Sequence, residues 1–305
     1  MAATAIVVYV THPRLVFAFK TRHGVWPHPA DPKTYADKML WRKVFDHNPL
    51  FPTISDKLEA KEFVADRSST IRCAETLWSG DHAGQIPLEL LRIDVMVKAN
   101  HGAGYNRLLR GGEVDIDQLI ADARRWLATP FHKLHGEWGY SKVSPRLFVE
   151  ELLIENGQPV RTELKFHVFG GRVHFCNMIL DRGAKLRSCA FERDGTRIGA
   201  IGIYGGGEDD PLPDVYPSAV NVAEELCHGF DYMRCDIYVL DGRLYFGELT
   251  IYPNGGYLKV RSEQVTAQMG LRWDITTSWF LSTRQRGFAG IYASALRRRL
   301  QGTML

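Results

Sequence analysis

The chain has 305 residues, a formal net charge of +3 at pH 7, 45% hydrophobic residues and 24% charged residues. This composition is close to that of soluble globular proteins, and it excludes disordered and fibrous classes. The net charge is too small, and the charges are too evenly spread, to indicate a nucleic-acid partner. A chain of this length can bury a substantial core and form two or three domains.

The cysteines and the apolar N-terminal run indicate the compartment. Five cysteines are widely spaced without a Cys-x-x-Cys pair, which favours free thiols in a reducing compartment. The apolar run 5–10 is too short to span a membrane and lacks the pattern of a secretory leader. We therefore expect a cytoplasmic protein without a transmembrane segment. The basic run 297–299 suits the end of a helix and leaves peripheral contact with an anionic membrane surface open.

Helices dominate the expected elements of the first half of the chain. Apolar residues at helical spacing predict a helix over 32–47. A second helix is predicted over 56–64, with the hydroxyl of Ser55 as its N-terminal cap. Residues 93–104 are expected to form a strand that runs into a glycine-containing loop, and residues 117–127 an amphipathic helix.

The second half of the chain changes to strands. Strands are predicted over 146–153, 162–169 and 172–179, with a tight turn at Gly170 and Gly171 joining the last two. Residues 181–216 are rich in Gly, Asp and Pro, which indicates loops over a site. A helix over 218–227, a hairpin over 234–256 and further helices close the chain. Helices that alternate with antiparallel strands predict an α+β fold.

Familiar motifs for several kinds of chemistry are absent from the sequence. There is no Gly-x-x-x-x-Gly-Lys-Ser/Thr phosphate loop, and no Gly-x-Gly-x-x-Gly lies between a strand and a helix. There is also no Gly-x-Ser-x-Gly elbow and no zinc-binding spacing among the eleven histidines. Nucleotide binding through those two loops, nucleophilic serine hydrolysis and a structural zinc site are therefore not indicated.

Two lysines lie within apolar strands. Lys98 ends one such run and is followed at once by the loop 100–104, whose glycines let backbone N–H groups approach an anion. The simpler alternative is an edge-strand lysine before a turn. Lys165 shares a strand face with His167, and it either faces a ligand or simply faces solvent.

The hairpin near residue 241 carries acids among apolar residues, where an uncompensated carboxylate is costly. Arg234 and Asp236 project from one face of its first strand, and Glu248 lies on the second strand. Pairing around the Asp241-Gly242 turn would bring the two acids together, an arrangement that suits Mg²⁺ completed by water and substrate phosphates. Asn254 could add an oxygen ligand. The alternative is an exposed hairpin with unrelated acids.

The order of these motifs resembles that of ATP-grasp enzymes, and most closely the TupA-like branch associated with bacterial surface-polymer synthesis. The resemblance runs from about residue 48 to about residue 270, and it includes Asp56-Lys57, Arg234-x-Asp236 and Gly247-Glu248. It implies an ATP-grasp fold in which ATP lies between two α+β subdomains with antiparallel sheets. The implied divisions are an N-terminal region, two subdomains and a helical extension, at 1–55, 56–145, 146–270 and 271–305.

The resemblance also implies a role for each site residue. Arg234 and Lys165 would be catalytic, with Arg234 stabilising the transferred phosphoryl group. Asp236 and Glu248 would bind Mg²⁺, with Asn254 as the candidate third ligand because Thr250 stands where many relatives have Asn. The residues that would bind ATP comprise phosphate-binding lysines, a flap and the strand that meets adenine, namely Lys57, Lys98, Lys165, His101, Gly102, Gly104, Glu150, Glu151 and Leu153.

These observations lead to an expected function. The expected enzyme is an ATP- and Mg²⁺-dependent carboxylate–amine ligase that works through an acyl-phosphate. Its substrate would be an amino acid or a sugar acid of a surface polymer or its precursor, a class that only the resemblance implies. The alternatives are a kinase that phosphorylates a sugar or lipid hydroxyl, with Asp181, His167 or His174 as the base, and a nucleotide-binding partner of a glycosyltransferase.

Overall fold

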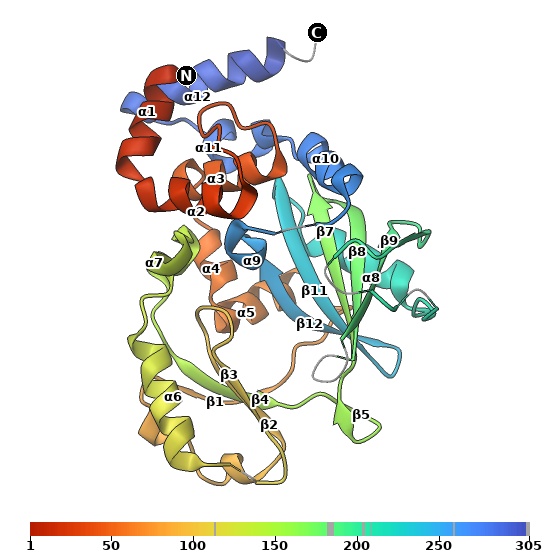
Figure 1. The fold of residues 1–305 in the computed structure, drawn as a ribbon. Coiled ribbons are helices and arrows are strands. Elements are labelled where there is room, and N and C mark those ends of the chain that lie inside the picture. The colour runs from red at the N-terminus through yellow and green to blue at the C-terminus, as the bar shows by residue number, and fades with distance from the viewer. Residues whose placement is uncertain (113, 182–185, 203–204, 208, 259, 303–305) are drawn as a thin grey trace.

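The structure is a computed structural model that describes residues 1–112, 114–181, 186–202, 205–207, 209–258 and 260–302. It contains a four-stranded and a six-stranded antiparallel sheet, with helices gathered at the end of the larger sheet that lies away from the smaller one (Figure 1). The predicted α+β class with antiparallel sheets is confirmed.

The four-stranded sheet has the order β1-β4-β2-β3. On β2, the side chains of Val95, Val97 and Ala99 are fully buried, whereas Met96 and Lys98 on the other face are only partly buried. This alternation places Lys98 on the face that does not pack on the core. The buried face packs against a helix, α6. The elements of this subdomain are β1 (Thr76–Gly80), β2 (Val95–Ala99), β3 (Asn106–Leu109), β4 (Leu147–Glu151) and α6 (Ile116–Ala128).

The six-stranded sheet has the order β10-β9-β8-β7-β11-β12, and it belongs to the main hydrophobic core. Strand β7 covers the residues that the sequence predicts, because its apolar face and the Gly170-Gly171 turn mark both ends. A helix, α8, packs against β7 and β8. The elements are β7 (Thr162–Phe169), β8 (Arg172–Leu180), β9 (Arg187–Glu192), β10 (Arg197–Gly199), β11 (Tyr232–Leu240), β12 (Arg243–Thr250) and α8 (Tyr216–Leu226).

Helices from the two ends of the chain pack together at one end of the molecule (Figure 1). Trp41 Nε1 donates to the Tyr292 hydroxyl at 3.0 Å, and Arg299 Nη2 forms an ion pair with Asp31 at 2.6 Å. Helix α3 is capped by Thr34, whose side chain accepts from the backbone N–H of Asp37. These helices are α1 (Ala2–Thr11), α2 (Pro13–His23), α3 (Tyr35–Phe45), α10 (Glu263–Arg272), α11 (Trp279–Ser282) and α12 (Gly287–Gly302).

Short elements connect the two sheets and the helical end. Two of them, α4 and α5, lead from the helical end toward the four-stranded sheet, and α7 lies between α6 and β4 in the chain. The short elements are α4 (Phe51–Ser55), α5 (Lys57–Arg67), α7 (His132–His135), α9 (Pro253–Gly256), β5 (Ile154–Glu155), β6 (Gln158–Pro159) and the 3-10 turns Ala83–Gln85, Leu90–Arg92, Trp138–Lys142 and Ile275–Thr277.

Two local predictions are wrong. The cap of α5 is Asp56 rather than Ser55, because the Asp56 carboxylate accepts from two backbone N–H groups while Ser55 ends α4. The segment 181–216 is not all loop, since β9 and β10 lie within it and extend the sheet beyond β8. Residues 182–185, 203–204 and 208 of that segment lie outside the described residues.

No single described helix has the length and hydropathy needed to cross a membrane. The pair α1 and α2 meets the criterion only when taken together, and the two helices are bent by 97° where they meet.

Candidate active site

Two cavities that share lining residues lie beside strand β12. The larger has a volume of about 780 Å³ and lies between the four-stranded sheet, including Lys98, and strand β12, including Phe246. The smaller has a volume of about 320 Å³ and lies toward α7 and α9. Both are lined by Ser55, Tyr140 and Glu248, so Glu248 stands at their junction.

An irregularity in the hairpin of β11 and β12 decides which side chains reach this junction. Asp241 and Gly242 both have positive φ, 48° and 68°, as a two-residue turn requires. Pairing is regular as far as Ile237 opposite Phe246, but Asp236 then pairs with Glu248 because Gly247 is inserted as a bulge. Without the bulge, Glu248 would project from the opposite face of the sheet.

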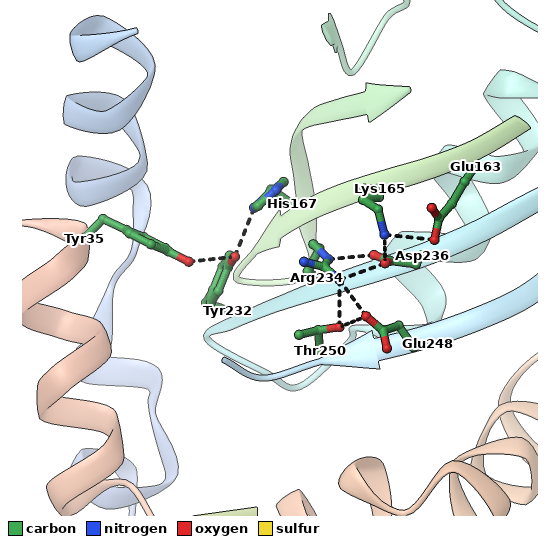
Figure 2. A network of polar contacts seen from close by, with 9 residues as sticks. All are labelled: Tyr35, Glu163, Lys165, His167, Tyr232, Arg234, Asp236, Glu248 and Thr250. Atoms are coloured by element: carbon green, nitrogen blue, oxygen red, sulfur yellow. Dashed lines mark hydrogen bonds and ion pairs between the residues drawn. The ribbon is translucent and has the colours of Figure 1, made fainter. Parts of the chain in front are cut away.

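Arg234 joins the two carboxylates that the bulge brings together (Figure 2). Its Nε donates to Asp236 Oδ1 at 2.7 Å, and its Nη2 donates to Asp236 Oδ2 at 2.8 Å and to Glu248 Oε1 at 2.6 Å. Thr250 Oγ1 accepts from Arg234 Nη2 at 3.1 Å and donates to Glu248 Oε1 at 2.8 Å. Four polar side chains from two strands therefore form one network on one face of the sheet.

Lys165 adds a second cation from the neighbouring strand β7. Asp236 pairs with Lys165 in the sheet register, and the Lys165 ammonium donates to the Asp236 carboxylate and to Glu163 Oε1, the latter at 2.8 Å. The alternative that Lys165 merely faces solvent is not what the structure shows, because its side chain is only 15% exposed. Lys165 is not among the residues that line either cavity.

The two cations set the charge of the buried acid. Burial alone would raise the pKa of Asp236, but the attraction of Arg234 and Lys165 outweighs burial and holds that pKa below its usual value. Burial alone would lower the pKa of Arg234, but Asp236 and Glu248 raise it above its usual value. Asp236 is therefore ionised and Arg234 protonated throughout the physiological range.

Asp236 and Glu248 are the two candidate oxygen donors for a divalent cation, and only Glu248 lines the cavities. Asp236 and Glu248 already converge on a single cationic group, the Arg234 guanidinium, and oxygen donors of this kind suit Mg²⁺. Glu248 also has a side chain that is 45% exposed at the cavities. Among the described residues, no three His, Cys, Asp or Glu side chains gather into a complete metal site. A pair of carboxylates is nevertheless enough for Mg²⁺, which usually takes one or two carboxylates and completes its shell with water and phosphates.

Three lysines line the larger cavity near one buried acid. The ammonium groups of Lys98 and Lys61 both form ion pairs with Glu150, the second at 2.8 Å. Lys57 Nζ donates to the backbone carbonyl of Gly102 at 2.5 Å, and burial lowers the pKa of Lys57 to about 8. The cavity therefore has a cationic wall that could hold phosphate groups.

The flap residues lie at different depths. The side chain of His101 is buried, its Nε2 lies 3.1 Å from the carbonyl of Trp126, and it lines neither cavity. Gly102 and Gly104 have φ of 78° and 76°, which favour glycine. Between them, Ala103 lines the smaller cavity. The loop therefore approaches the site through its backbone and Ala103, and His101 anchors it to α6.

The other predicted residues fall on two walls. Glu150, Glu151 and Leu153 line the larger cavity, where the Glu151 carboxylate accepts from the backbone N–H of Glu75 at 2.9 Å. Asn254 lines the smaller cavity and has a left-handed φ of 52°. Most of the predicted site residues therefore line one of the two cavities. The exceptions are Lys165, Asp236, His101, Gly102 and Gly104.

Sequence reasoning missed two site residues. Lys61 lies one helical turn after Lys57, so the spacing of these lysines on α5 could have revealed it. Glu137 lines the smaller cavity and is 6% exposed. It lies in the short link between α7 and the 3-10 turn Trp138–Lys142, and no sequence pattern marks it.

Solved structures of three ATP-grasp enzymes are similar to this chain. N5-carboxyaminoimidazole ribonucleotide synthetase with ADP has 12% identity and a TM-score of 0.42, and the match covers 65% of this chain and 45% of that one. The ATP-grasp ligase PsnB with minimal precursor, Mg and ADP has 16% identity and a TM-score of 0.39, with coverages of 87% and 65%. D-alanine–D-alanine ligase from Bacillus anthracis with ATP has 16% identity and a TM-score of 0.43, with coverages of 77% and 68%.

The chain therefore spans about half the length of the first of these enzymes and about two thirds of the other two. No curated protein was found to match the chain. A family model, that of the TupA-like ATP-grasp proteins, matches residues 37–271. That match includes both sheets, both cavities and the Arg234 network, and the chain belongs to the TupA-like ATP-grasp family.

Proposed function

We propose that this ATP-grasp enzyme is a carboxylate–amine ligase that uses ATP and Mg²⁺. The observation that carries the proposal is the position of Glu248 where the two cavities meet, joined through Arg234 to Asp236. The larger cavity has the size and the lysine-rich wall for a nucleotide, and the smaller one would hold the other substrates. The proposed substrate is an amino acid or a sugar acid used in surface-polymer synthesis, as the family suggests.

The proposed reaction has two steps. A carboxylate oxygen of the substrate attacks the γ-phosphorus of ATP, the bond to the β-phosphate bridging oxygen breaks, and ADP leaves. An amine then attacks the acyl carbon, loses a proton, and releases inorganic phosphate as the amide forms. Both steps depend mainly on alignment of the reactants and on neutralisation of charge, since no protein nucleophile is needed.

Each group has a role in that scheme. Lys57, Lys61 and Lys98 would hold the phosphates along the wall of the larger cavity. Arg234 would stabilise the phosphoryl group in transfer, with Lys165 keeping Asp236 ionised behind it. Asp236 and Glu248 would hold Mg²⁺, and Asn254 is the candidate third ligand. When bound, Mg²⁺ would neutralise the nucleotide phosphates.

Hydroxylamine trapping tests the proposal against the kinase alternative. Purified enzyme would be incubated with ATP, Mg²⁺, hydroxylamine and panels of amino acids, uronic acids, sugars and lipid alcohols, with ADP release as the first measurement. A ligase yields a hydroxamate from the acyl-phosphate, whereas a kinase yields a stable phosphoester. A phosphoester without hydroxamate would overturn the ligase proposal.

The structure does not favour the bases named for a kinase. His167 Nδ1 lies 2.9 Å from the Tyr232 hydroxyl in a fully buried position, where burial lowers its pKa well below the usual value. Asp181 lines the larger cavity, but Arg161 and Arg187 form ion pairs with it at 2.5 and 2.8 Å. His174 lines neither cavity.

A further inference from the structure

The smaller cavity contains a buried acid that the proposed phosphoryl-transfer chemistry does not use. Glu137 is 6% exposed and lines this cavity together with Glu248 and Arg234. Among the described residues, none donates a hydrogen bond to the Glu137 carboxylate, and none forms an ion pair with it within 4.0 Å. Buried carboxylates usually have such a partner, so this one lies at the cavity without a direct partner.

Lys43, a cation that acts on Glu137, is hydrogen-bonded elsewhere. Lys43 is 4% exposed, and its ammonium donates to the backbone carbonyls of His135, at 2.7 Å, and of Gly255. These two bonds hold Lys43 at the wall that α7 and α9 form. Burial raises the pKa of Glu137 to about 7 even though Lys43 attracts its charge, so the nearby lysine only partly offsets the cost of burial.

The other groups of the cavity leave a place for one more cation. Arg234 is already paired with Asp236 and Glu248. Burial lowers the pKa of His135, which makes this imidazole neutral at physiological pH. The aromatic and apolar part of the remaining wall comprises Ala103, Phe131, Tyr140, Leu249, Ile251 and Tyr252, and the rest comprises Ser55, Thr250, Asn254 and Gly255, none of which carries a charge.

We infer that Glu137 binds the ammonium group of the acceptor substrate in the smaller cavity. This inference rests on the proposed function, because it assigns the amine of that ligase to a named residue. The cavity volume of about 320 Å³ is at the lower end of the range for ligand sites, about 300–1,000 Å³, so the acceptor is one small unit, such as an amino acid derivative or a single amino sugar. The aromatic wall would pack on its carbon skeleton.

Matched pairs of small ligands test this inference on the wild-type protein. Glucosamine would be compared with N-acetylglucosamine, and L-alaninamide with N-acetyl-L-alaninamide, by ligand-observed NMR in the presence of Mg²⁺ and a non-hydrolysable ATP analogue. The free amine of at least one pair is expected to bind and its acetylated partner is not, because acetylation removes the positive charge. Equal binding within the pairs, or no binding by any free amine, would overturn the inference.

The variant Glu137→Gln tests the residue itself. Its affinity for the free amine is expected to fall on the order of 10- to 100-fold, as for loss of a charge-assisted hydrogen bond. Glu62→Gln, at an exposed glutamate on α5, is the matched control and should bind the amine as the wild type does. ADP affinity and thermal unfolding show whether each variant is folded, and Glu137→Asp, which keeps the carboxylate, should restore part of the amine affinity. Unchanged amine affinity in Glu137→Gln would contradict the assignment.

The two proposals fail separately. Amine binding that depends on Glu137, without hydroxamate in the trapping experiment, would contradict the ligase reaction and not the amine site. Hydroxamate formation together with amine binding that is independent of Glu137 would contradict only the amine site.

Discussion

Asp236 and Glu248 face each other directly across β11 and β12, and the bulge at Gly247 is what makes them neighbours. A regular two-residue hairpin would pair Asp236 with position 247 and direct Glu248 to the opposite face of the sheet. A Cβ at Gly247 would lie 2.9 Å from the backbone oxygen of Asp236, so a glycine is required there. The face of the hairpin that is proposed to bind Mg²⁺ therefore depends on one backbone irregularity.

Gly247→Ala should lower stability and activity together. The added methyl group has no room against the backbone of Asp236, and the resulting shift should lower the free energy of unfolding by about 1–3 kcal/mol. Urea unfolding and ATP turnover would measure the two effects. Gly84→Ala is the control, because a Cβ there meets nothing within 4 Å. Unchanged turnover in Gly247→Ala would show that the bulge does not position Glu248.

Glu248→Gln and Asp236→Asn should differ in stability although both remove a carboxylate. Glu248 has a 45% exposed side chain, so its substitution should leave the protein folded while ATP turnover falls on the order of 100-fold or more. Asp236 is fully buried between two cations, and removing the buried carboxylate that both of them contact should cost about 3–5 kcal/mol. Turnover and denaturant unfolding of both variants check this. Wild-type turnover in Glu248→Gln would overturn the metal assignment.

Nucleotide affinity should decrease as the pH rises above about 8. Burial lowers the pKa of Lys57 to about 8, so this ammonium loses its charge, and its attraction for phosphate, as the pH rises through that value. The affinity for ADP should fall by up to about tenfold per pH unit where one proton is involved. Lys57→Arg, which stays charged, should move the decline to higher pH. An affinity that shows the same pH dependence in both proteins would exclude Lys57 as its origin.

Asp46→Asn should stabilise the protein above neutral pH. Burial raises the pKa of Asp46 to about 7 in the folded state, so the unfolded chain loses this proton first as the pH rises. Between the unfolded pKa of about 4 and the folded pKa of about 7, the wild type therefore loses stability with rising pH. An asparagine does not titrate and keeps an oxygen to accept from the backbone N–H of Phe280.

The expected result for Asp46→Asn is a Tm higher by about 2 °C or more at pH 8, with a smaller difference or none at pH 5. Calorimetry at the two pH values measures it. A Tm difference that is the same at both pH values would mean that the substitution acts through packing rather than through ionisation.

Much of the local structure could be predicted because local patterns determine it. Strand β7 (Thr162–Phe169) and helix α6 (Ile116–Ala128) match their predicted ranges to within a residue, since alternation and helical spacing are properties of short segments. The cap of α5 could not be assigned in the same way. Ser55 and Asp56 are both good capping residues, and only the end of α4 at Ser55 leaves Asp56 free to cap.

Some residues of the candidate site could likewise be predicted from the sequence, and others could not. Lys98 could be proposed from its place between an apolar run and a glycine loop, Glu248 from the pairing of the hairpin, and Lys57 from the family resemblance. The structure places all three on the walls of the larger cavity. Glu137 could not be proposed, because nothing in its neighbours distinguishes it from a surface glutamate. Its burial arises from the packing of segments that are distant in the chain, including Lys43 at the wall formed by α7 and α9.

By itself, the sequence determined the class of the fold, the hairpin with its Asp241-Gly242 turn, and the types of side chain available for phosphate and metal binding. These depend on residue preferences over a few positions. Only the tertiary structure decided that Glu248 faces Asp236, that Arg234 joins them, and that Glu137 lies buried at a second cavity. A one-residue bulge reverses the face of every following side chain, and burial of a charge depends on packing between distant segments.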